Sequence, residues 1–271
     1  MPTSRIPEPV STLDDPRVWH YRNLKDRELD RTGKWFIAEG EHVVRRLLAS
    51  DFPVESVFLS EKRAAQMAPL VPPNVPVYVA PQHLMEQVLG FKFHSGVVAC
   101  GKRKPRASID EVIPKDRERL TVVACPDLSN VENVGSMIRL CAGFGVDALV
   151  LGEHSHDPFW RQSVRVSMGT VFSLPIVHSE NLLRDLTRLR DEWGVEFAAT
   201  VLDETAEPLS SASRGARFGL LFGNEAQGLD DAHVAVCQRR VTIPMKLGTD
   251  SLNVAVAAGI FLYHFTRPPT R

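Results

Sequence analysis

Along most of the chain, short apolar runs typical of buried strands alternate with segments whose apolar residues recur at helical spacing. In the first part, the predicted strands and helices alternate over residues 35–40, 41–49, 54–60, 61–70, 75–80, 81–90 and 96–102. In the second part, they alternate over residues 120–126, 134–145, 146–151, 159–171, 175–179, 180–193, 195–202 and 217–223, before a short helix and a last strand and helix. Near-continuous apolar strands between helices predict an α/β fold with a mostly parallel sheet that is covered on both faces.

The same pattern divides the chain into two α/β domains. Residues 1–20 are rich in Pro, Ser and Asp and are expected to form a flexible arm. Residues 21–104 are predicted to form a small first domain, and residues 117–271 a larger second one. The basic, proline-containing stretch that begins at Gly101 marks the boundary, with residues 105–116 as the linker.

Composition narrows the class of protein. Of the 271 residues, 44% are hydrophobic and 24% are charged, as in soluble globular proteins. We expect no targeting leader and no membrane span, because the termini are polar and no apolar run is long enough to cross a bilayer. The four cysteines lack CxxC spacing, which favours the reducing cytoplasm over a disulfide framework or a zinc site. The nine histidines also lack ligand spacing, so no metal is expected.

The small net charge of −1 conceals an uneven distribution. Residues 1–106 contain 16 Lys and Arg against 12 Asp and Glu, whereas residues 107–271 contain 16 against 21. A basic first part is compatible with a polyanion partner, although charged faces are more often simply solvated.

The most informative stretch runs from Ile243 to Gly259. It contains a strand end broken at Pro244, a polar loop and an almost wholly apolar helix that is predicted to reach about Phe265. Ser251 is a candidate N-cap of this helix. Asn253 is a polar residue in the apolar first turn, and a buried side chain of this kind needs a partner that either the fold or a ligand supplies.

Two further motifs follow predicted strands. Asn133 and Arg139 belong to the first, NVENVGSMIR, and lie near the carboxyl end of a strand, where open α/β sheets bind ligands. The second is LLFGNEAQGL, in which Gly223 lets backbone approach a ligand closely and Glu225 follows in the loop. A buried arginine paired with a carboxylate, and a solvated loop glutamate, are the structural alternatives. Neither motif is GxGxxG or GxxxxGK, so a dinucleotide-dependent oxidoreductase or P-loop protein lacks its main support.

Taken together and in this order, the three motifs resemble the signature of the SpoU-type (TrmH-like) RNA ribose 2′-O-methyltransferases of the SPOUT superfamily. That signature is N-x-x-N-x-G-x-x-x-R, then G-N-E-x-x-G-L after an apolar strand, then I-P-M…S-L-N-V, and the resemblance covers about residues 120–266. The segment from Arg165 to Gly169 is also similar to the family. More loosely, Phe36 to Val43 and His94 to Ala99 are similar to its L30e-like substrate-binding domain.

The resemblance implies a deep trefoil knot in the second domain, with S-adenosylmethionine as cofactor and methyl transfer to a ribose 2′-hydroxyl. The positions implied to bind the cofactor are Leu221, Phe222, Gly223, Ile243, Met245 and Leu252. The positions implied to be catalytic are Asn133, Arg139, Glu225, Ser251 and Asn253.

Roles within this set are hypotheses. Arg139 is expected first to clamp a phosphate and second to act as a base, because a guanidinium with a pKa above about 12 is a poor general base. Ser251 and Asn253 are expected to orient the ribose, while Glu225 holds Arg139 or Asn133 in place. The resemblance also implies a homodimer whose sites share groups, with the apolar face from Ile260 to Tyr263 as its interface or as core.

The expected RNA partner is ribosomal RNA, with tRNA as the alternative within the family. The residues of the first domain that are candidates to bind its phosphates are Arg22, Lys25, Arg27 and Arg31. A relative that binds RNA without catalysing methylation is the remaining rival, although the set of candidate catalytic residues is intact.

Overall fold

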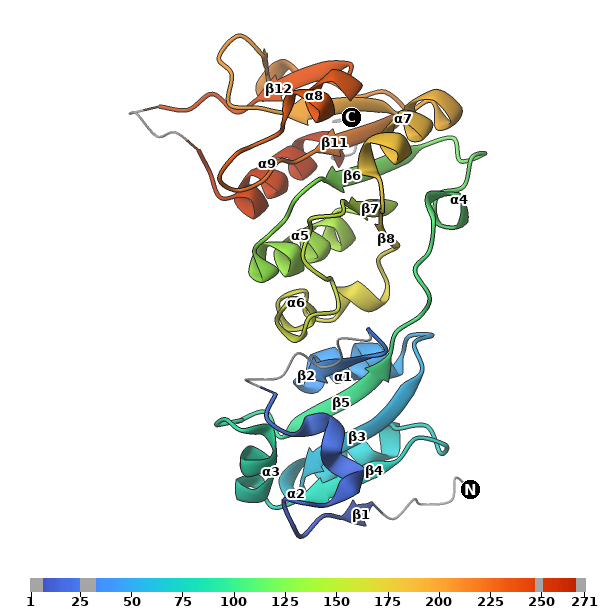
Figure 1. Ribbon diagram of the computed structural model, residues 1–271, viewed down its shortest axis with the longest axis vertical. Coiled ribbons are helices and arrows are strands. Elements are labelled where there is room, and N and C mark those ends of the chain that lie inside the picture. The colour runs from blue at the N-terminus through green and yellow to red at the C-terminus, as the bar shows by residue number, and fades with distance from the viewer. Residues whose placement is uncertain (1–6, 25–32, 247–250, 267–271) are drawn as a thin grey trace, which may run out of the picture. The chain divides into compact units, whose positions relative to one another are not determined.

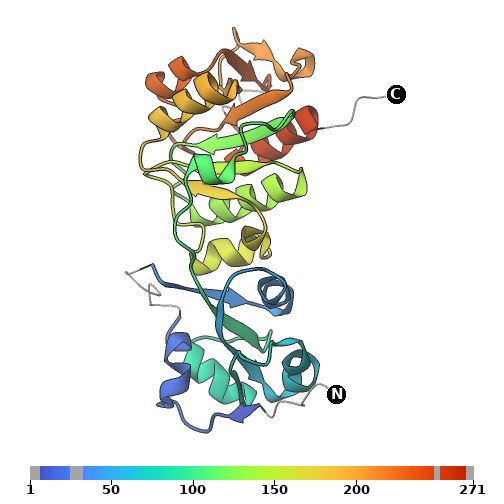
Figure 2. The ribbon, with the colours of Figure 1, turned by 90° about the vertical axis from the view of Figure 1, so that its right-hand side faces the viewer.

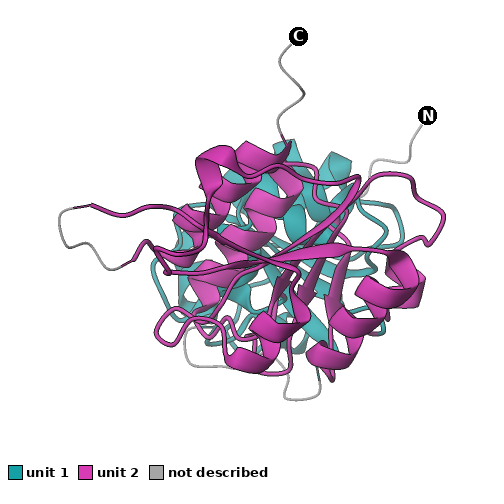
Figure 3. Ribbon diagram, turned by 90° about the horizontal axis from the view of Figure 1, so that it is seen from above, with its two compact units in different colours: residues 1–105, 159–172 teal, residues 106–158, 173–271 magenta. Residues whose placement is uncertain are grey.

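Two sheets organise the part of the chain that the computed structural model describes, which is residues 7–24, 33–246 and 251–266. The chain forms two units, each with one of the sheets (Figure 3). The first unit consists of residues 1–105 and 159–172, and the second of residues 106–158 and 173–271.

The first unit contains a five-stranded mixed sheet with the strand order β1-β4-β3-β5-β2 (Figure 1). The β3–β4 and β1–β4 pairs are parallel, whereas β5 is antiparallel to both of its neighbours. Its elements are β1 (Glu8–Pro9), η1 (Pro16–Tyr21), β2 (Trp35–Glu39), α1 (Glu41–Leu48), β3 (Val54–Ser60), α2 (Glu61–Met67), η2 (Ala68–Leu70), β4 (Val77–Ala80), α3 (Gln82–Leu89), β5 (Val97–Lys102), α6 (Arg161–Val166) and η3 (Thr170–Phe172).

The second unit contains a seven-stranded sheet with the order β10-β12-β9-β11-β6-β7-β8, and every strand pair in it is parallel. This confirms the predicted parallel α/β architecture. Its elements are α4 (Ile109–Val112), β6 (Leu120–Cys125), α5 (Val131–Gly143), β7 (Ala148–Leu151), β8 (Ile176–His178), α7 (Leu182–Trp193), β9 (Glu196–Thr200), β10 (Glu207–Pro208), η4 (Leu209–Ser211), β11 (Arg217–Leu221), α8 (Asp231–Val236), β12 (Arg239–Thr242) and α9 (Val254–Thr266).

Helices cover both faces of the parallel sheet. Successive side chains of a strand point to opposite faces, and because both sets are apolar here, both faces have to be buried. On one face, Phe218 of β11 packs against Phe265 of α9 with ring centroids 4.7 Å apart, and α9 lies beside α5 (Figure 2). On the other face, Leu221 of β11 and Val122 of β6 share a buried cluster with Leu186 of α7. The apolar strands are therefore buried from both sides, as their composition predicts.

Residues 7–20 correct the prediction of a flexible arm. Val10 and Val18 are buried in the core of the first unit, and β1 extends its sheet by pairing Glu8 with Tyr78. Two buried valines among polar and proline residues are enough to fix the segment, which composition alone did not indicate. Residues 1–6 lie outside the described residues.

Residues 106–116 correct the prediction of a linker, because they pack on the second unit. The side chains of Ile109 and Ile113 are buried, and the indole nitrogen of Trp193 donates a 2.8 Å hydrogen bond to the carbonyl of Ile113. Ser108 and Glu111 form a capping box at the start of α4. The segment is thus anchored on α7 by buried apolar groups.

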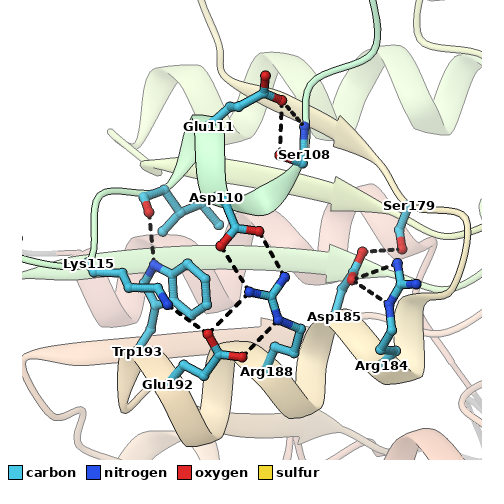
Figure 4. Close-up of polar contacts among 11 residues, drawn as sticks. Ser108, Asp110, Glu111, Lys115, Ser179, Arg184, Asp185, Arg188, Glu192 and Trp193 are labelled. Carbon is cyan, nitrogen blue, oxygen red and sulfur yellow. Dashed lines mark hydrogen bonds and ion pairs between the residues drawn. The ribbon is translucent and has the colours of Figure 1, made fainter.

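A surface ion-pair network holds the same segment (Figure 4). Arg188 of α7 donates two hydrogen bonds, of 2.8 and 2.9 Å, to the carboxylate of Asp110. Arg188 and Lys115 also pair with Glu192, at 2.8 and 2.7 Å respectively. These bonds lower the pKa of Glu192 to about 2.

The helix predicted over residues 159–171 is shorter in the structure and belongs to the first unit. α6 ends at Val166, because Met168 and Gly169 adopt the left-handed φ values of 54° and 80°. Phe159 and Phe172, at the two ends of this segment, both pack on Phe36 of β2, with ring centroids 5.3 Å apart in each case. The prediction that each domain is one continuous stretch of the chain is therefore wrong, because residues 159–172 belong to the first unit.

Within the described ranges, none of the helices combines the length and the apolar character that crossing a membrane requires.

Candidate active site

A chain of side-chain hydrogen bonds joins three of the candidate catalytic residues. The side-chain amide of Asn253 donates to Oδ1 of Asn133 at 3.0 Å, and the side-chain amide of Asn133 donates to Oε1 of Glu225 at 2.8 Å. These residues come from the start of α9, the first turn of α5 and the loop after β11. All three elements begin at the carboxyl edge of the parallel sheet, which is where such sheets place ligands.

Asn253 occupies the N-cap position of α9. Its Oδ1 accepts hydrogen bonds from the amides of Ala255 and Val256 at 2.9 and 3.3 Å. Ser251 was expected in this role and instead lies exposed two residues earlier, where it lines a cavity. Asn253 is exposed and not buried as expected, but the fold still supplies it with a partner, Asn133.

Glu225 lies at the N-terminus of α5. Besides the bond from Asn133, its carboxylate receives longer contacts of 3.4 Å from the hydroxyl of Ser129 and from the amide of Asn130. The side chain of Asn130 caps the helix by accepting from the amide of Glu132 at 2.8 Å. A carboxylate at this position is favoured by the free amides and the dipole of the helix. Glu225 therefore holds Asn133, and among the described residues it makes no ion pair with Arg139.

The loop that carries Glu225 is held by Asn224. Oδ1 of Asn224 accepts from the amide of Ala226 at 2.8 Å, and its side-chain amide donates to Asp127 at 2.9 Å. Gly223 precedes it, and a Cβ atom there would lie 2.2 Å from the backbone carbon of Gly228. The glycine is therefore needed for the close approach of this loop to itself.

A cavity of about 450 Å³ opens beside the hydrogen-bonded chain. Glu225 and Ser251 lie on its wall, so two of the candidate catalytic residues face it. The residues that line it are Thr200, Val201, Leu202, Phe222–Leu229, Ile243, Met245, Ser251, Leu252, Val254, Ala257 and Phe261. This size is within the range of pockets that enclose small ligands.

Five of the six residues expected to bind a cofactor line this cavity: Phe222, Gly223, Ile243, Met245 and Leu252. Leu221 does not, because its side chain is directed into the core on the α7 face of the sheet. Thr200 and Leu202 on the segment after β9 were missed, because no motif marks that strand. The hydroxyl of Thr200 donates to the carbonyl of Leu221 at 2.8 Å.

Arg139 stands apart from the other candidates. It lies on α5 six residues after Asn133, a rise of about 9 Å with a rotation of about 240° around the helix. Its side chain is exposed and has no hydrogen bond or ion pair with another described residue. The predicted proximity of Arg139 to Glu225 is therefore not found within one chain.

Three of the four RNA-binding candidates, Lys25, Arg27 and Arg31, lie outside the described residues. Arg22 is half-buried, and its guanidinium donates to the carbonyl of Asp15 at 3.1 Å and pairs with Asp14 at 3.8 Å. The structure therefore shows an intramolecular role for Arg22 and does not test the other three.

Cys125 ends β6 beneath this site. Burial, and then the nearby Cys141 and Glu225, raise the pKa of its thiol well above the usual value. The thiol is therefore protonated at neutral pH and is a poor nucleophile. Among the described residues, no group of three or more His, Cys, Asp or Glu side chains could hold a metal ion. The expected absence of a metal stays a prediction.

Comparison with known proteins agrees with this geometry. The profile of the SpoU rRNA Methylase family matches residues 120–263. An uncharacterized tRNA/rRNA methyltransferase of Mycobacterium tuberculosis is 38% identical over 95% of this chain and 91% of its own. The 23S rRNA (guanosine(2553)-2′-O)-methyltransferase RlmP of Bacillus subtilis is 27% identical over 94% and 98%. The crystal structure of an rRNA methyltransferase from Sinorhizobium meliloti with bound AdoMet matches with a TM-score of 0.81 and 26% identity, over 95% and 96% of the two chains.

Proposed function

The chain belongs to the SpoU rRNA methylase family, and from this premise we propose that the RNA it methylates is ribosomal RNA. The protein is an S-adenosylmethionine-dependent methyltransferase of the SPOUT α/β class, which transfers a methyl group to a ribose 2′-hydroxyl of RNA. The preference for ribosomal RNA is supported by the 23S rRNA specificity in the names of the Bacillus and Acinetobacter relatives. A tRNA substrate is the second candidate, because the Mycobacterium relative is named for both.

The observation that carries the proposal is the position of the cavity beside the chain formed by Asn253, Asn133 and Glu225. The cavity fits the cofactor, because its wall combines apolar side chains such as Phe222 and Leu252 with the backbone of the loop from Gly223 to Gly228. S-adenosylmethionine supplies the methyl group when bound. The residues of the chain have to place the ribose hydroxyl in line with that group and exclude competing water.

Each polar residue has a defined task in this arrangement. The side chains of Asn253 and Asn133 are held in place by a hydrogen bond to each other. Asn133 is also bonded to Glu225, and Asn253 to the first amides of α9. Ser251 and Glu225 face the cavity, where they contact the ribose hydroxyls. Glu225 is the group best placed to accept the hydroxyl proton, since its carboxylate is exposed on the cavity wall.

We infer that the protein is a homodimer in which Arg139 of one chain serves the site of the other. α9 exposes three apolar side chains at i, i+4 and i+7, namely Val256, Ile260 and Tyr263, which are 53%, 41% and 59% exposed. Such a stripe is suited to a second copy of the same helix about a two-fold axis. α5 packs beside α9, so a dimer through this face brings the exposed Arg139 towards the partner. There its guanidinium clamps the phosphate next to the target ribose.

The remaining assignments belong to the same proposal. We assign the first unit to RNA binding as an L30e-like domain, with Arg22, Lys25, Arg27 and Arg31 contributing positive charge. We assign the second unit a deep trefoil knot, supported by its membership of the SPOUT class. A cytoplasmic location is supported by four free cysteines, three of them buried.

The test is methyl transfer from radiolabelled S-adenosylmethionine to RNA from cells that lack the enzyme. Protein-free ribosomal RNA, assembled ribosomal particles and the tRNA pool are assayed separately. Methylation of a 2′-hydroxyl makes the adjoining phosphodiester resistant to alkali, because that hydroxyl is the attacking group in alkaline cleavage. Alkali-stable label in ribosomal RNA supports the proposal, while label confined to tRNA selects the second candidate. Label in methylated bases would contradict ribose methylation.

A further inference from the structure

A second cavity, of about 490 Å³, lies at the opposite edge of the parallel sheet. It is bounded by the start of β6, the C-terminal end of α5 and the last residue of α9, so it is at the amino ends of the strands. Three arginines line it: Arg117, Arg119 and Arg214. The ten residues of α5 that follow Asn133 separate this residue from the second cavity by about 15 Å of helix. It is therefore distinct from the cofactor cavity.

Arg214 is held rigidly in this second cavity. Its guanidinium donates to the hydroxyl of Thr121 at 2.7 Å and to the carbonyls of Leu120, Gly215 and Ala216 at 2.9, 3.0 and 3.0 Å. All four acceptors are neutral, so the positive charge is fixed in place without a carboxylate in direct contact. Burial, and then the charge of Arg119, lower the pKa of Arg214.

The carboxylates nearby do not balance the three arginines. Asp147 pairs with Arg117 at 2.8 Å and also accepts from the amide of Thr121 at 2.7 Å. Glu118 is exposed at the rim. Arg119 is exposed and makes no ion pair or hydrogen bond with another described residue. The guanidinium of Arg214 is thus fixed and half-buried, that of Arg119 is exposed to solvent, and the lining carries one net positive charge.

We propose that this second cavity binds a phosphate group of the substrate RNA, at a point remote from the methylated nucleotide. Guanidinium groups recognise phosphate through paired, charge-assisted hydrogen bonds. The fixed Arg214 sets the position of the charge, and the exposed Arg119 adds a second guanidinium to the phosphate. The inference rests on the proposed action on RNA. It gives the second unit a contact with RNA of its own, on the edge of the sheet opposite the reacting ribose.

The test compares Arg119→Gln with the wild type in binding protein-free ribosomal RNA over a series of salt concentrations. Arg119 is exposed, so its replacement leaves the fold intact, and calorimetry with S-adenosylmethionine verifies that the cofactor cavity is unchanged. Arg190→Gln is the matched control, because Arg190 is a partly exposed arginine of α7, on the other face of the sheet, and pairs with its neighbour Asp191. Methyl transfer by the wild type to the same RNA reports separately on the proposed function.

We expect Arg119→Gln to weaken RNA binding about tenfold and to reduce the slope of log affinity against log salt by about 0.7 to 0.9, the effect of one lost phosphate contact. The Arg190→Gln control should bind as the wild type does. Equal affinity and salt slope for Arg119→Gln and the wild type would overturn the proposal. A second outcome would also overturn it: the wild type binds inorganic phosphate, and Arg119→Gln loses this binding but still binds RNA as the wild type does. The site would then hold a free small anion and not a phosphate of the RNA.

Discussion

The side-chain amide of Asn253 donates a hydrogen bond to the side-chain oxygen of Asn133 across 3.0 Å, which ties the start of α9 to the start of α5. The two residues are 120 positions apart in the chain. Because Asn253 also caps α9 and Asn133 also donates to Glu225, this one contact couples a helix terminus to the residues at the cofactor cavity.

Asn253→Asp separates these two tasks. The aspartate keeps an oxygen that caps α9, so we expect the free energy of unfolding to stay within about 1 kcal/mol of the wild type. It cannot donate to Asn133, and its charge faces an oxygen there, so methyl transfer should fall by at least about tenfold through misplacement of the site. Thermal unfolding and a methyl-transfer assay measure the two effects. Full activity in Asn253→Asp would show that the contact with Asn133 is dispensable.

Arg139→Ala and Glu225→Ala should each be inactive as homodimers. When the two variants are co-expressed with different tags and the mixed dimer is purified, one of its two sites contains both residues if Arg139 acts across the interface. The mixed dimer should then regain about half of the wild-type activity per dimer. If Arg139 acts in its own chain, neither site is complete and the mixed dimer stays inactive.

Ile260→Asp places a charge in the middle of the apolar stripe on α9. We expect it to convert the dimer into monomers and to abolish methyl transfer, because a buried unpaired carboxylate is costly and Arg139 would lose its partner site. Sedimentation velocity measures the change in mass. Leu70→Asp is the control, since Leu70 is 44% exposed, close to the 41% of Ile260, but belongs to the first unit. A dimer that survives Ile260→Asp would exclude this face of α9 as the interface.

The ion pairs of Glu192 predict a loss of stability in acid. Its pKa is lowered from 4.5 to about 2 by hydrogen bonds from Arg188 and Lys115, so its stabilising effect is complete above pH 4.5 and disappears as the pH falls towards 2. Exposure to solvent keeps the effect small. Unfolding of the wild type and Glu192→Gln, measured between these pH values, should show a smaller acid-induced loss in the variant. Parallel curves would contradict the assignment to Glu192.

The sequence motifs predict which residues come together at the site better than they predict the structural role of each residue. Asn133, Glu225 and Asn253 are joined by hydrogen bonds, and most of the expected cofactor residues line one cavity. The N-cap residue of α9 is Asn253 and not Ser251. Both residue types cap helices, so only the path of the backbone decides which of them does so. Similarly, the loop itself occupies the space beside Gly223 that a ligand was expected to fill.

The errors in domain organisation share a physical cause. The burial of Val10 and of Ile109, each in a short polar segment, depends on surfaces far away in the sequence. The early end of α6 follows from left-handed φ at Met168, a conformation that composition rarely indicates for a non-glycine residue. Arg139 lies away from Glu225 for a different reason, because the six residues of α5 between Asn133 and Arg139 turn the guanidinium to another side of the helix.

The most direct measurement is calorimetric titration of S-adenosylmethionine into the wild type and into Ala257→Leu and Ala255→Leu. Ala257 lines the cavity and Ala255, on the same first turn of α9, does not. A variant at Gly223 is unsuitable, because any side chain there would clash with Gly228. We predict one cofactor per chain for the wild type and Ala255→Leu, and binding weakened by about tenfold or more in Ala257→Leu because the added atoms occupy the cavity. Unchanged binding by Ala257→Leu would contradict the placement of the cofactor, and with it the active site described around Asn133 and Glu225.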